Sequence, residues 1–194
     1  GNGTADQLVF TDINAGNVSL SYEGTDLTIT IAESTPGAGD GGSVKLVGTL
    51  IDDYYQGFES IIFADGTIWN AATIRAQTIQ AVQTSGNDTI VGFNSNETYV
   101  GGQGNDVING GNGNDTYIYA RGDGDDIITE TRGNGTADQL VFTDINAGNV
   151  LLTRNGSDLT ISIAETVPGA GNSGMVKLTG SLVDDFGLGV DSIV

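Results

Sequence analysis

The chain has 194 residues, among them 31 glycines, no cysteine and no histidine, and its formal net charge is −19 from 25 acidic and 6 basic residues. Without cysteine and histidine there are no disulfides, no Cys/His zinc site and no histidine-based nucleophile system, and the negative charge disfavours nucleic acid and anionic membrane surfaces as partners. No apolar run approaches the roughly 18 residues of a transmembrane helix, and glycine together with Thr, Ile and Val favours an all-β fold with many tight turns.

Residues 1–62 and 133–194 are two copies of one sequence, identical at 42 of 62 positions. The stretch GNGTADQLVFTDINAGNV occurs unchanged at 1–18 and at 133–150. The chain is therefore about one and a half units of a 132-residue repeat. We expect it to be a piece of a longer tandem array, with any export signal outside this piece or already removed. A fixed period favours a solenoid-like repeat array over a compact enzyme.

Each copy is expected to contain an antiparallel β-hairpin. Residues 150–163, VLLTRNGSDLTISI, alternate apolar and polar side chains around Asn155-Gly156, which is a strong signal for a type I′ turn. The first copy has Glu23-Gly24 at the corresponding place, a weaker turn signal. A loop and a VKL strand follow in both copies.

The first copy continues as ESIIFADGTIWNAATI, residues 59–74. The pair Asp65-Gly66 predicts a second tight hairpin turn within this run. Asn70 is a suitable N-cap for a short helix over residues 71–76, and that helix would lead into the next segment.

Residues 83–118 consist of four nine-residue units, QTSGNDTIV, GFNSNETYV, GGQGNDVIN and GGNGNDTYI. The sixth position of each unit is acidic, and a large apolar residue follows two positions later. The acidic residues are Asp88, Glu97, Asp106 and Asp115, and the apolar ones are Ile90, Tyr99, Ile108 and Tyr117. The alternative of a low-complexity linker does not account for this phase, which is kept over all four units.

The spacing predicts a flattened coil in which two units make one turn, because three strand residues alternate with a six-residue glycine-rich turn. Residues 18 apart then stack at the strand spacing of about 4.8 Å, with Asp88 over Asp106 and Glu97 over Asp115. Two carboxylates about 5 Å apart repel by roughly 1–3 kcal/mol, so a ladder of them requires a cation. A hard divalent ion with six or more oxygen ligands fits between successive loops. Such an ion would also supply the stability that this small core lacks.

The nonapeptides resemble the RTX (repeats-in-toxin, haemolysin-type) calcium-binding repeat GGxGxDxUx, in which U is a large apolar residue. The third and fourth units match every constrained position, and the first lacks the opening glycines. The second has Phe93, Ser95 and Glu97 where Gly, Gly and Asp are usual. The resemblance implies a parallel β-roll that folds on binding several Ca²⁺ ions, roughly three to six, held by position-six carboxylates and loop carbonyls of stacked turns.

After the fourth unit, YARGDGDDIITE at 119–130 resembles the GDGxD loop that follows regular repeats in this family. Asp126 lies 20 residues after Asp106 and predicts a third rung on that edge, and Asp138 lies 23 residues after Asp115 on the other. The predicted calcium ligands are the carboxylates of Asp88, Glu97, Asp106, Asp115, Asp123, Asp126, Glu130 and Asp138, and loop positions Gly101, Gly102, Gln103, Gly104, Gly110, Gly111, Asn112, Gly113, Gly122 and Gly124. For Asp123 and Glu130 the alternative is a solvated surface acid.

The predicted organisation is a haemolysin-type calcium-binding-related β module at 1–76, an RTX β-roll at 77–132 and a second, truncated copy of the β module at 133–194. The first copy resembles that family in its DLTI and FADGTIW sequences, and the second copy repeats DLTI. We expect no enzymatic activity. Adjacent acids such as Asp52-Asp53, repeated in the second copy as Asp184-Asp185, point to opposite faces of a strand and cannot face each other across a glycosidase cleft.

The leading functional prediction is a calcium-binding structural module of a large secreted bacterial surface or matrix protein, such as an adhesin or a biofilm matrix filament. The resemblance implies export through a type I secretion system and folding on extracellular calcium. The alternative is the calcium-binding tail of a secreted enzyme or toxin whose catalytic domain lies outside this chain. The expected partners are calcium and neighbouring repeats, with head-to-tail self-assembly as a further option; nucleic-acid binding and membrane insertion are not expected.

Overall fold

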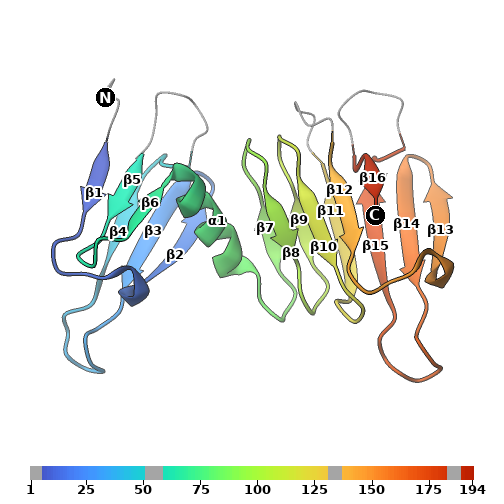
Figure 1. The fold of residues 1–194 in the computed structure, drawn as a ribbon, viewed down its shortest axis with the longest axis horizontal. Helices are drawn as coiled ribbons and strands as arrows, with labels where there is room; N and C mark the ends of the chain where they lie inside the picture. The colour runs from blue at the N-terminus through green and yellow to red at the C-terminus, as the bar shows by residue number, and fades with distance from the viewer. Residues whose placement is uncertain (1–5, 51–58, 131–136, 183–188) are drawn as a thin grey trace. The chain divides into compact units, whose positions relative to one another are not determined.

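The computed structural model describes residues 6–50, 59–130, 137–182 and 189–194, and the contacts divide the chain into two units, 1–81 and 82–194. The described residues form mainly β-strands with one α-helix (Figure 1), which confirms the all-β prediction. That helix has 12 residues, and none in the described ranges is both long and apolar enough to cross a membrane.

The first unit contains an antiparallel sheet of three strands in the order β2 (Val18–Glu23), β3 (Asp26–Ile31) and β4 (Gly42–Leu46). Alternate side chains of a strand point to opposite faces, and along β3 this sends Leu27 and Ile29 to one face, where both are fully buried. The arrangement is the predicted hairpin followed by the VKL strand.

A second sheet of the first unit combines β1 (Gln7–Val9), β5 (Ser60–Ile62) and β6 (Ile68–Asn70), with β1 parallel and β6 antiparallel to β5. The β5–β6 connection turns at Gly66, in the predicted Asp-Gly pair. Gly66 has a φ of 83° and its N–H donates to the carbonyl of Phe63 at 3.0 Å. This turn was therefore predicted correctly.

The helix α1 (Ala71–Val82) follows β6 directly. Its first turn is capped as predicted, because Oδ1 of Asn70 accepts the N–H of Thr73 at 2.8 Å. The helix continues past the predicted end at residue 76. Ile74 and Ile79 are both buried, and this tertiary packing stabilises the later turns, which the local sequence signals did not indicate.

The second unit is a parallel β-roll whose chain passes alternately through two sheets (Figure 1). In one sheet β7 (Thr89–Val91), β9 (Val107–Asn109) and β11 (Asp125–Thr129) are parallel neighbours. In the other sheet β8 (Thr98–Val100) is parallel to β10 (Thr116–Tyr119). The predicted β-roll is thereby confirmed.

The second copy of the repeat continues both sheets of the roll. In one sheet β12 (Gln139–Phe142) lies parallel to β10, and β16 (Ser192–Ile193) lies parallel to β12. In the other, β15 (Gly174–Thr179) lies parallel to β11, and the antiparallel hairpin of β13 (Val150–Asn155) and β14 (Asp158–Ile163) extends it. The strand orders are therefore β16-β12-β10-β8 and β13-β14-β15-β11-β9-β7.

The two copies of the repeat share their element order. One turn of 3-10 helix, Ala15–Asn17 in the first copy and Ala147–Asn149 in the second, precedes β2 and β13 respectively. Strands β1 to β5 correspond to β12 to β16 at the offset of 132 residues. The doublets Asp52-Asp53 and Asp184-Asp185 lie outside the described residues.

The register stacks successive turns of the roll as predicted. Thr89 pairs with Val107 and Thr98 pairs with Thr116, so both pairs are 18 residues apart. The offset becomes 20 between β9 and β11 and 23 between β10 and β12. The position-six residues therefore form two ladders, one along each edge of the roll.

The core of the roll consists of the apolar side chains at position eight, which point between the two sheets. Ile90, Tyr99, Ile108 and Tyr117 are all buried. The rings of Tyr99 and Tyr117 are stacked, with centroids 5.3 Å apart. Position eight thus supplies one large buried side chain per half-turn, and the second unit buries Phe93 in addition.

The turn between β13 and β14 differs from the prediction. A type I′ turn requires positive φ at both central residues. Gly156 has a φ of 64°, but no described residue other than glycine has a positive φ. Asn155 pairs with Asp158, so Gly156-Ser157 is the two-residue loop and the glycine comes first. The hairpin prediction is confirmed and the type I′ prediction is wrong, because the strand continues through Asn155.

Some glycines are required where one turn of the roll rests on the preceding turn. Gly111 and Gly122 have φ values of 95° and 89°. A Cβ on Gly111 would overlap the carbonyl oxygen of Phe93 in the turn before, whereas nothing lies within 4 Å of a Cβ on Gly122. A side chain would be strained by the positive φ at both positions, but only at Gly111 would it also overlap the preceding turn.

Gly111→Ala should therefore destabilise the roll more than Gly122→Ala. We expect about 1–2 kcal/mol from the positive φ in both variants, and about 1–3 kcal/mol more at Gly111 from the steric overlap. Denaturant unfolding in the presence of calcium measures both losses. Equal losses would show that the turns are not packed against each other as described.

Candidate metal centre

Carboxylates along one edge of the roll accept backbone N–H groups from the turn before. Oδ1 of Asp106 accepts the N–H of Asp88 at 2.8 Å, and Oδ1 of Asp126 accepts the N–H of Asp106 at 3.0 Å. The carboxylate of Asp88, at the first turn, instead accepts the N–H and hydroxyl of Thr84. Asp106 is fully buried, and its Oδ2 has no hydrogen-bond partner.

The other edge repeats this arrangement over four acidic residues. Oδ1 of Asp115 accepts the N–H of Glu97, and Oδ1 of Asp138 accepts the N–H of Asp115, both at 2.8 Å. The N–H of Asp138 donates in turn to Oδ2 of Asp191 at 2.8 Å. Asp115 is fully buried, and its Oδ2 likewise has no partner.

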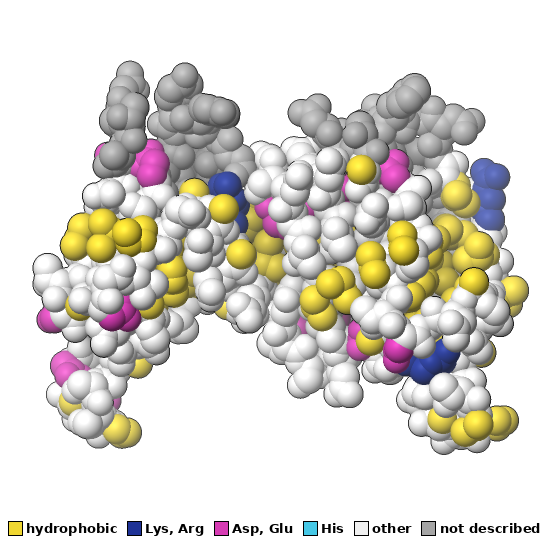
Figure 2. Space-filling model, in the orientation of Figure 1, with side chains coloured by type: hydrophobic (Ala, Val, Ile, Leu, Met, Phe, Trp, Pro, Cys, Tyr) yellow, Lys and Arg dark blue, Asp and Glu magenta, His cyan; other side chains and the backbone are white. Residues whose placement is uncertain are grey.

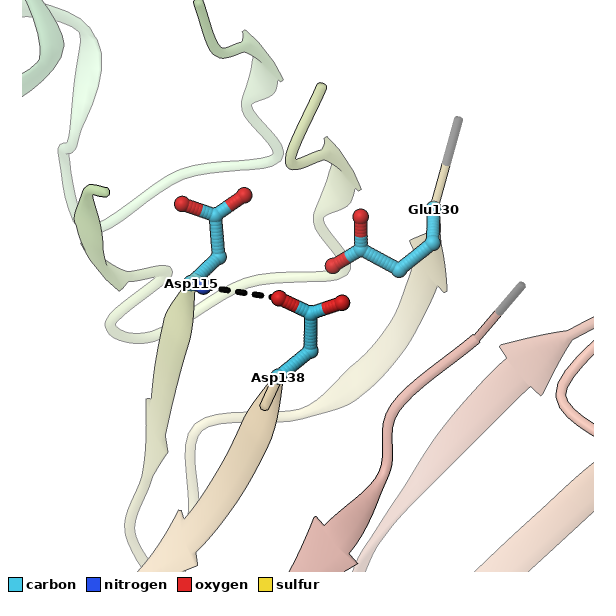
Figure 3. Close-up of side chains that lie close together, drawn as sticks. All are labelled: Asp115, Glu130 and Asp138. Carbon is cyan, nitrogen blue, oxygen red and sulfur yellow. Dashed lines mark hydrogen bonds between the residues drawn. The ribbon is translucent and has the colours of Figure 1, made fainter. Parts of the chain in front are cut away.

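Three acidic side chains converge on this second edge (Figure 3). Asp115 directly precedes β10, Asp138 directly precedes the neighbouring β12, and Glu130 directly follows β11 of the opposite sheet. One carboxylate oxygen from each lies within 4.8 Å of the others, and all three residues are buried. The convergence follows from the coil, since the end of β11 leads back to the edge at which β10 and β12 begin.

Burial makes these acids weak. It raises the pKa of Asp115 and Asp126 to about 7, and neighbouring carboxylates add to the rise. Burial also raises the pKa of Glu130 to about 8, although the hydroxyl of Tyr117 donates to its carboxylate and opposes the shift. Burial also raises the pKa of Asp138; the N–H of Asp115 that donates to its carboxylate opposes the shift, and the charge of Asp191 adds to it.

The printed sequence has 25 acidic residues against 6 basic ones. Two of the basic residues, Lys45 and Lys177, form ion pairs with Asp26 and Asp158, which are not among the buried acids of the roll. Several buried carboxylates with unpartnered oxygens are costly unless a cation joins them. A hard cation that takes oxygen ligands, such as Ca²⁺, fits this donor set.

The structure separates the predicted acidic ligands into groups. Asp115, Glu130 and Asp138 form the cluster on one edge, and Asp106 and Asp126 are adjacent on the other. Glu97 is turned to its own loop, where its carboxylate accepts the N–H of Phe93 and the hydroxyl of Ser95. Asp123 accepts the N–H of Ala120 at 2.7 Å, also within its own loop.

The predicted loop positions have two kinds of environment. Glycines at the second and fourth positions of the loops have positive φ, and these are Gly102, Gly104, Gly111, Gly113, Gly122 and Gly124. Gly101 and Gly110 lack a positive φ, but a Cβ there would overlap Oδ2 of Asp106 and the hydroxyl of Tyr117 respectively. Gln103 is exposed, and the side-chain amide of Asn112 donates to Asn94 of the preceding turn.

A ladder of asparagines at position five was missed by the sequence analysis. The N–H of Asn105 donates to Oδ1 of Asn87 at 2.8 Å, and the N–H of Asn114 donates to Oδ1 of Asn96 at 2.9 Å. The N–H of Asp125 donates to Oδ1 of Asn105 at 3.0 Å and so extends the series of Asn87 and Asn105 by one turn. The same nine-residue period that revealed the acids would have revealed these asparagines.

Replacing Asp115 with Asn should separate a metal ligand from a merely structural residue. Asn can still accept the N–H of Glu97 but carries no charge. We expect about 10–100-fold weaker calcium binding, by calorimetric titration, together with a more stable chain in chelator at pH 8, because repulsion is removed. The matched control is Asp125→Asn, an exposed neighbour on β11, which should change neither. Destabilisation both with and without calcium would contradict the assignment.

The raised pKa values predict an unusual pH dependence for the calcium-free chain. In the folded chain the pKa is about 7 for Asp115 and Asp126 and about 8 for Glu130, against ordinary values of 3.8 for Asp and 4.5 for Glu. The folded state then binds more protons between about pH 4 and pH 8, so its stability falls as the pH rises through this window. In chelator, circular dichroism should show more β-structure at pH 5 than at pH 8. Equal content at both values would contradict the burial of these acids.

Two segments of the chain match known families. Residues 26–73 match the haemolysin-type calcium binding protein related domain, and residues 84–102 and 91–125 match the RTX calcium-binding nonapeptide repeat. No curated protein matches the chain. The RTX nonapeptide repeats bind Ca²⁺, the type of cation for which the buried carboxylates are suited. These two matches assign residues 26–73 and 84–125 to the RTX haemolysin-type calcium-binding family, and the RTX repeats support a calcium-binding module of a secreted bacterial protein.

Proposed function

We propose that the chain is a structural segment of a long extracellular array, such as a bacterial surface adhesin or a matrix filament, which becomes ordered when it binds calcium outside the cell. The observation that carries this proposal is the way the second copy of the repeat is built onto the roll. Strands β12 and β15 continue its two sheets without interruption. Within residues 82–194 the roll and the second copy therefore form one continuous pair of hydrogen-bonded sheets.

The repetition of the module, with 42 of 62 positions identical, supports a role in extending a stalk or presenting several copies rather than in catalysis. Tandem copies multiply a binding surface or extend a stalk, and neither needs variation between units. The conspicuous acids of the roll also have structural partners: they accept backbone N–H groups of adjacent turns and cluster with one another. We propose no catalytic function for them.

The electrostatics of the roll support folding that is coupled to calcium. At neutral pH the calcium-free roll would bury several acids in a low-polarity interior, which opposes folding. Sites with the affinity typical of extracellular modules, about 10⁻⁴–10⁻³ M, would be empty at low cytosolic calcium and filled outside. Such a chain would stay unfolded during export through a type I system and would fold after it.

The alternative function is the calcium-binding tail of a secreted enzyme or toxin. The sequence of the parent protein separates the two functions. An adhesin or filament should contain further 132-residue copies, whereas a tail should follow a catalytic domain and contain few such copies.

A calcium titration tests the proposed function directly. Starting from chelator at pH 7.5, calcium should induce β-structure cooperatively in far-UV circular dichroism and reduce the hydrodynamic radius by size-exclusion chromatography. Magnesium is the control and should do neither at equal concentration, because it demands a tight octahedral shell and gives up its water reluctantly. A chain that is equally folded in chelator would overturn the proposal.

A further inference from the structure

Strands β1 and β4 lie at sheet edges, although their counterparts in the second copy do not. Within the described residues β1 pairs with β5 alone and β4 pairs with β3 alone. The counterpart of β1 is β12, which pairs in addition with β10 of the roll, and the counterpart of β4 is β15, which pairs in addition with β11. The same module thus has a covered edge in one copy and an open edge in the other.

Side chains along the open edge are more exposed than their counterparts. Asp6 is exposed and Asp138 is buried, although both follow the same sequence GNGTA. Val44 of β4 is half-buried, whereas Val176 of β15 is fully buried. Val9 of β1 is 54% exposed, and hydrophobic side chains are visible over the β1 edge of this unit in Figure 2. The difference between the copies is the presence of the roll.

A pair of equivalent glycines shows the same contrast sterically. A Cβ on Gly174, at the start of β15, would overlap the hydroxyl of Tyr119 and lie 2.5 Å from the carbonyl oxygen of Gly124, both in the roll. A Cβ on Gly42, at the start of β4, would meet nothing within 4 Å. The space that the roll fills beside the second copy is therefore open beside the first.

We propose that the open edge formed by β1 and β4 is a docking surface for the carboxyl-terminal end of another nonapeptide roll, that of a repeat preceding this one. The occupant is a roll with the sequence of residues 83–130, because that is the segment against which the second copy packs. This inference rests on the proposed tandem array and specifies how its repeats are joined.

The hydrogen bonds that the docked roll would form are given by the second copy. The N–H of Gln139 donates to the carbonyl of Asp115 at 2.8 Å, and the N–H of Met175 donates to the carbonyl of Gly124 at 3.0 Å. Their counterparts on the open edge are the N–H groups of Gln7 and Ser43. Each donor is thus already placed on a strand with the required pairing direction.

The open edge also carries a candidate calcium ligand, Asp6. Asp138 completes the cluster with Asp115 and Glu130 of the roll that precedes it. Asp6 occupies the equivalent place, so it would supply the third carboxylate to the last turn of the incoming roll. Docking would then be linked to calcium, since the ion has ligands from both repeats.

Hydrogen exchange on a chain lengthened by one repeat tests the inference. Residues 1–132 are added ahead of the full 194-residue chain, and Lys45→Arg in the added repeat alone gives its β4 peptide a distinct mass. In calcium, β4 of the original copy now follows a roll, and its amides should exchange at least about tenfold more slowly than those of β4 in the added copy. The added copy, which no roll precedes, is the internal control, and β15 is the reference for a covered strand.

Gly42→Val in the original copy should abolish the slower exchange of β4, because a Cβ on the counterpart Gly174 would overlap the roll. The matched variant Gly16→Val should leave the slower exchange unchanged, because nothing lies within 4 Å of a Cβ on Gly16. Equal exchange of both β4 strands while β15 stays protected would overturn the inference. Protection that increases with protein concentration would also overturn it, since the occupant would then be another molecule. Either result is independent of whether calcium folds the chain, which the titration decides.

Discussion

Burial of like charges governs this fold. Asp106 and Asp115 are fully buried, each uses one carboxylate oxygen to accept a backbone N–H, and each leaves the other oxygen without a partner. The roll buries little more than one large apolar side chain per half-turn, which is too little to offset the chain entropy of about 1–2 kcal/mol per residue. Under the proposed function, a cation that joins the carboxylates would supply the missing stability.

The sequence predicted those features of the roll that follow from its nine-residue repeat. An acid every nine residues and an apolar residue two positions later require a coil of two units per turn, and the registers of β7 with β9 and of β8 with β10 have that offset. The turn at Gly66 and the cap at Asn70 were predicted from local chemistry that tertiary packing did not override. The calcium roles of individual residues remain predictions, because they depend on an ion rather than on the chain.

Features that depend on packing between distant residues were not predictable. Glu130 is buried beside Asp115 because β11 ends where β10 begins, which no local spacing shows. The continuation of the roll into β12 and β15 depends on two segments far apart in the sequence reaching the same edge. The helix α1 extends past residue 76 because Ile74 and Ile79 are buried by tertiary contacts. In each case the deciding interaction is long-range, whereas the sequence signals used were local.

The two hydrogen-bond ladders of the roll run in opposite directions. Each position-six N–H is accepted by the following turn, and each position-five N–H is accepted by the preceding one. Unmatched groups therefore arise only at the two ends, and their number does not grow with the number of turns. The two ends of the roll therefore reduce its folding stability by a fixed free energy, whereas every added turn increases the stability by the same amount, as in a one-dimensional cooperative chain. A roll of four nonapeptides is short on this scale, so it should melt as a single block whose midpoint is set by the module that covers its end, whereas a much longer roll would fray from its tips.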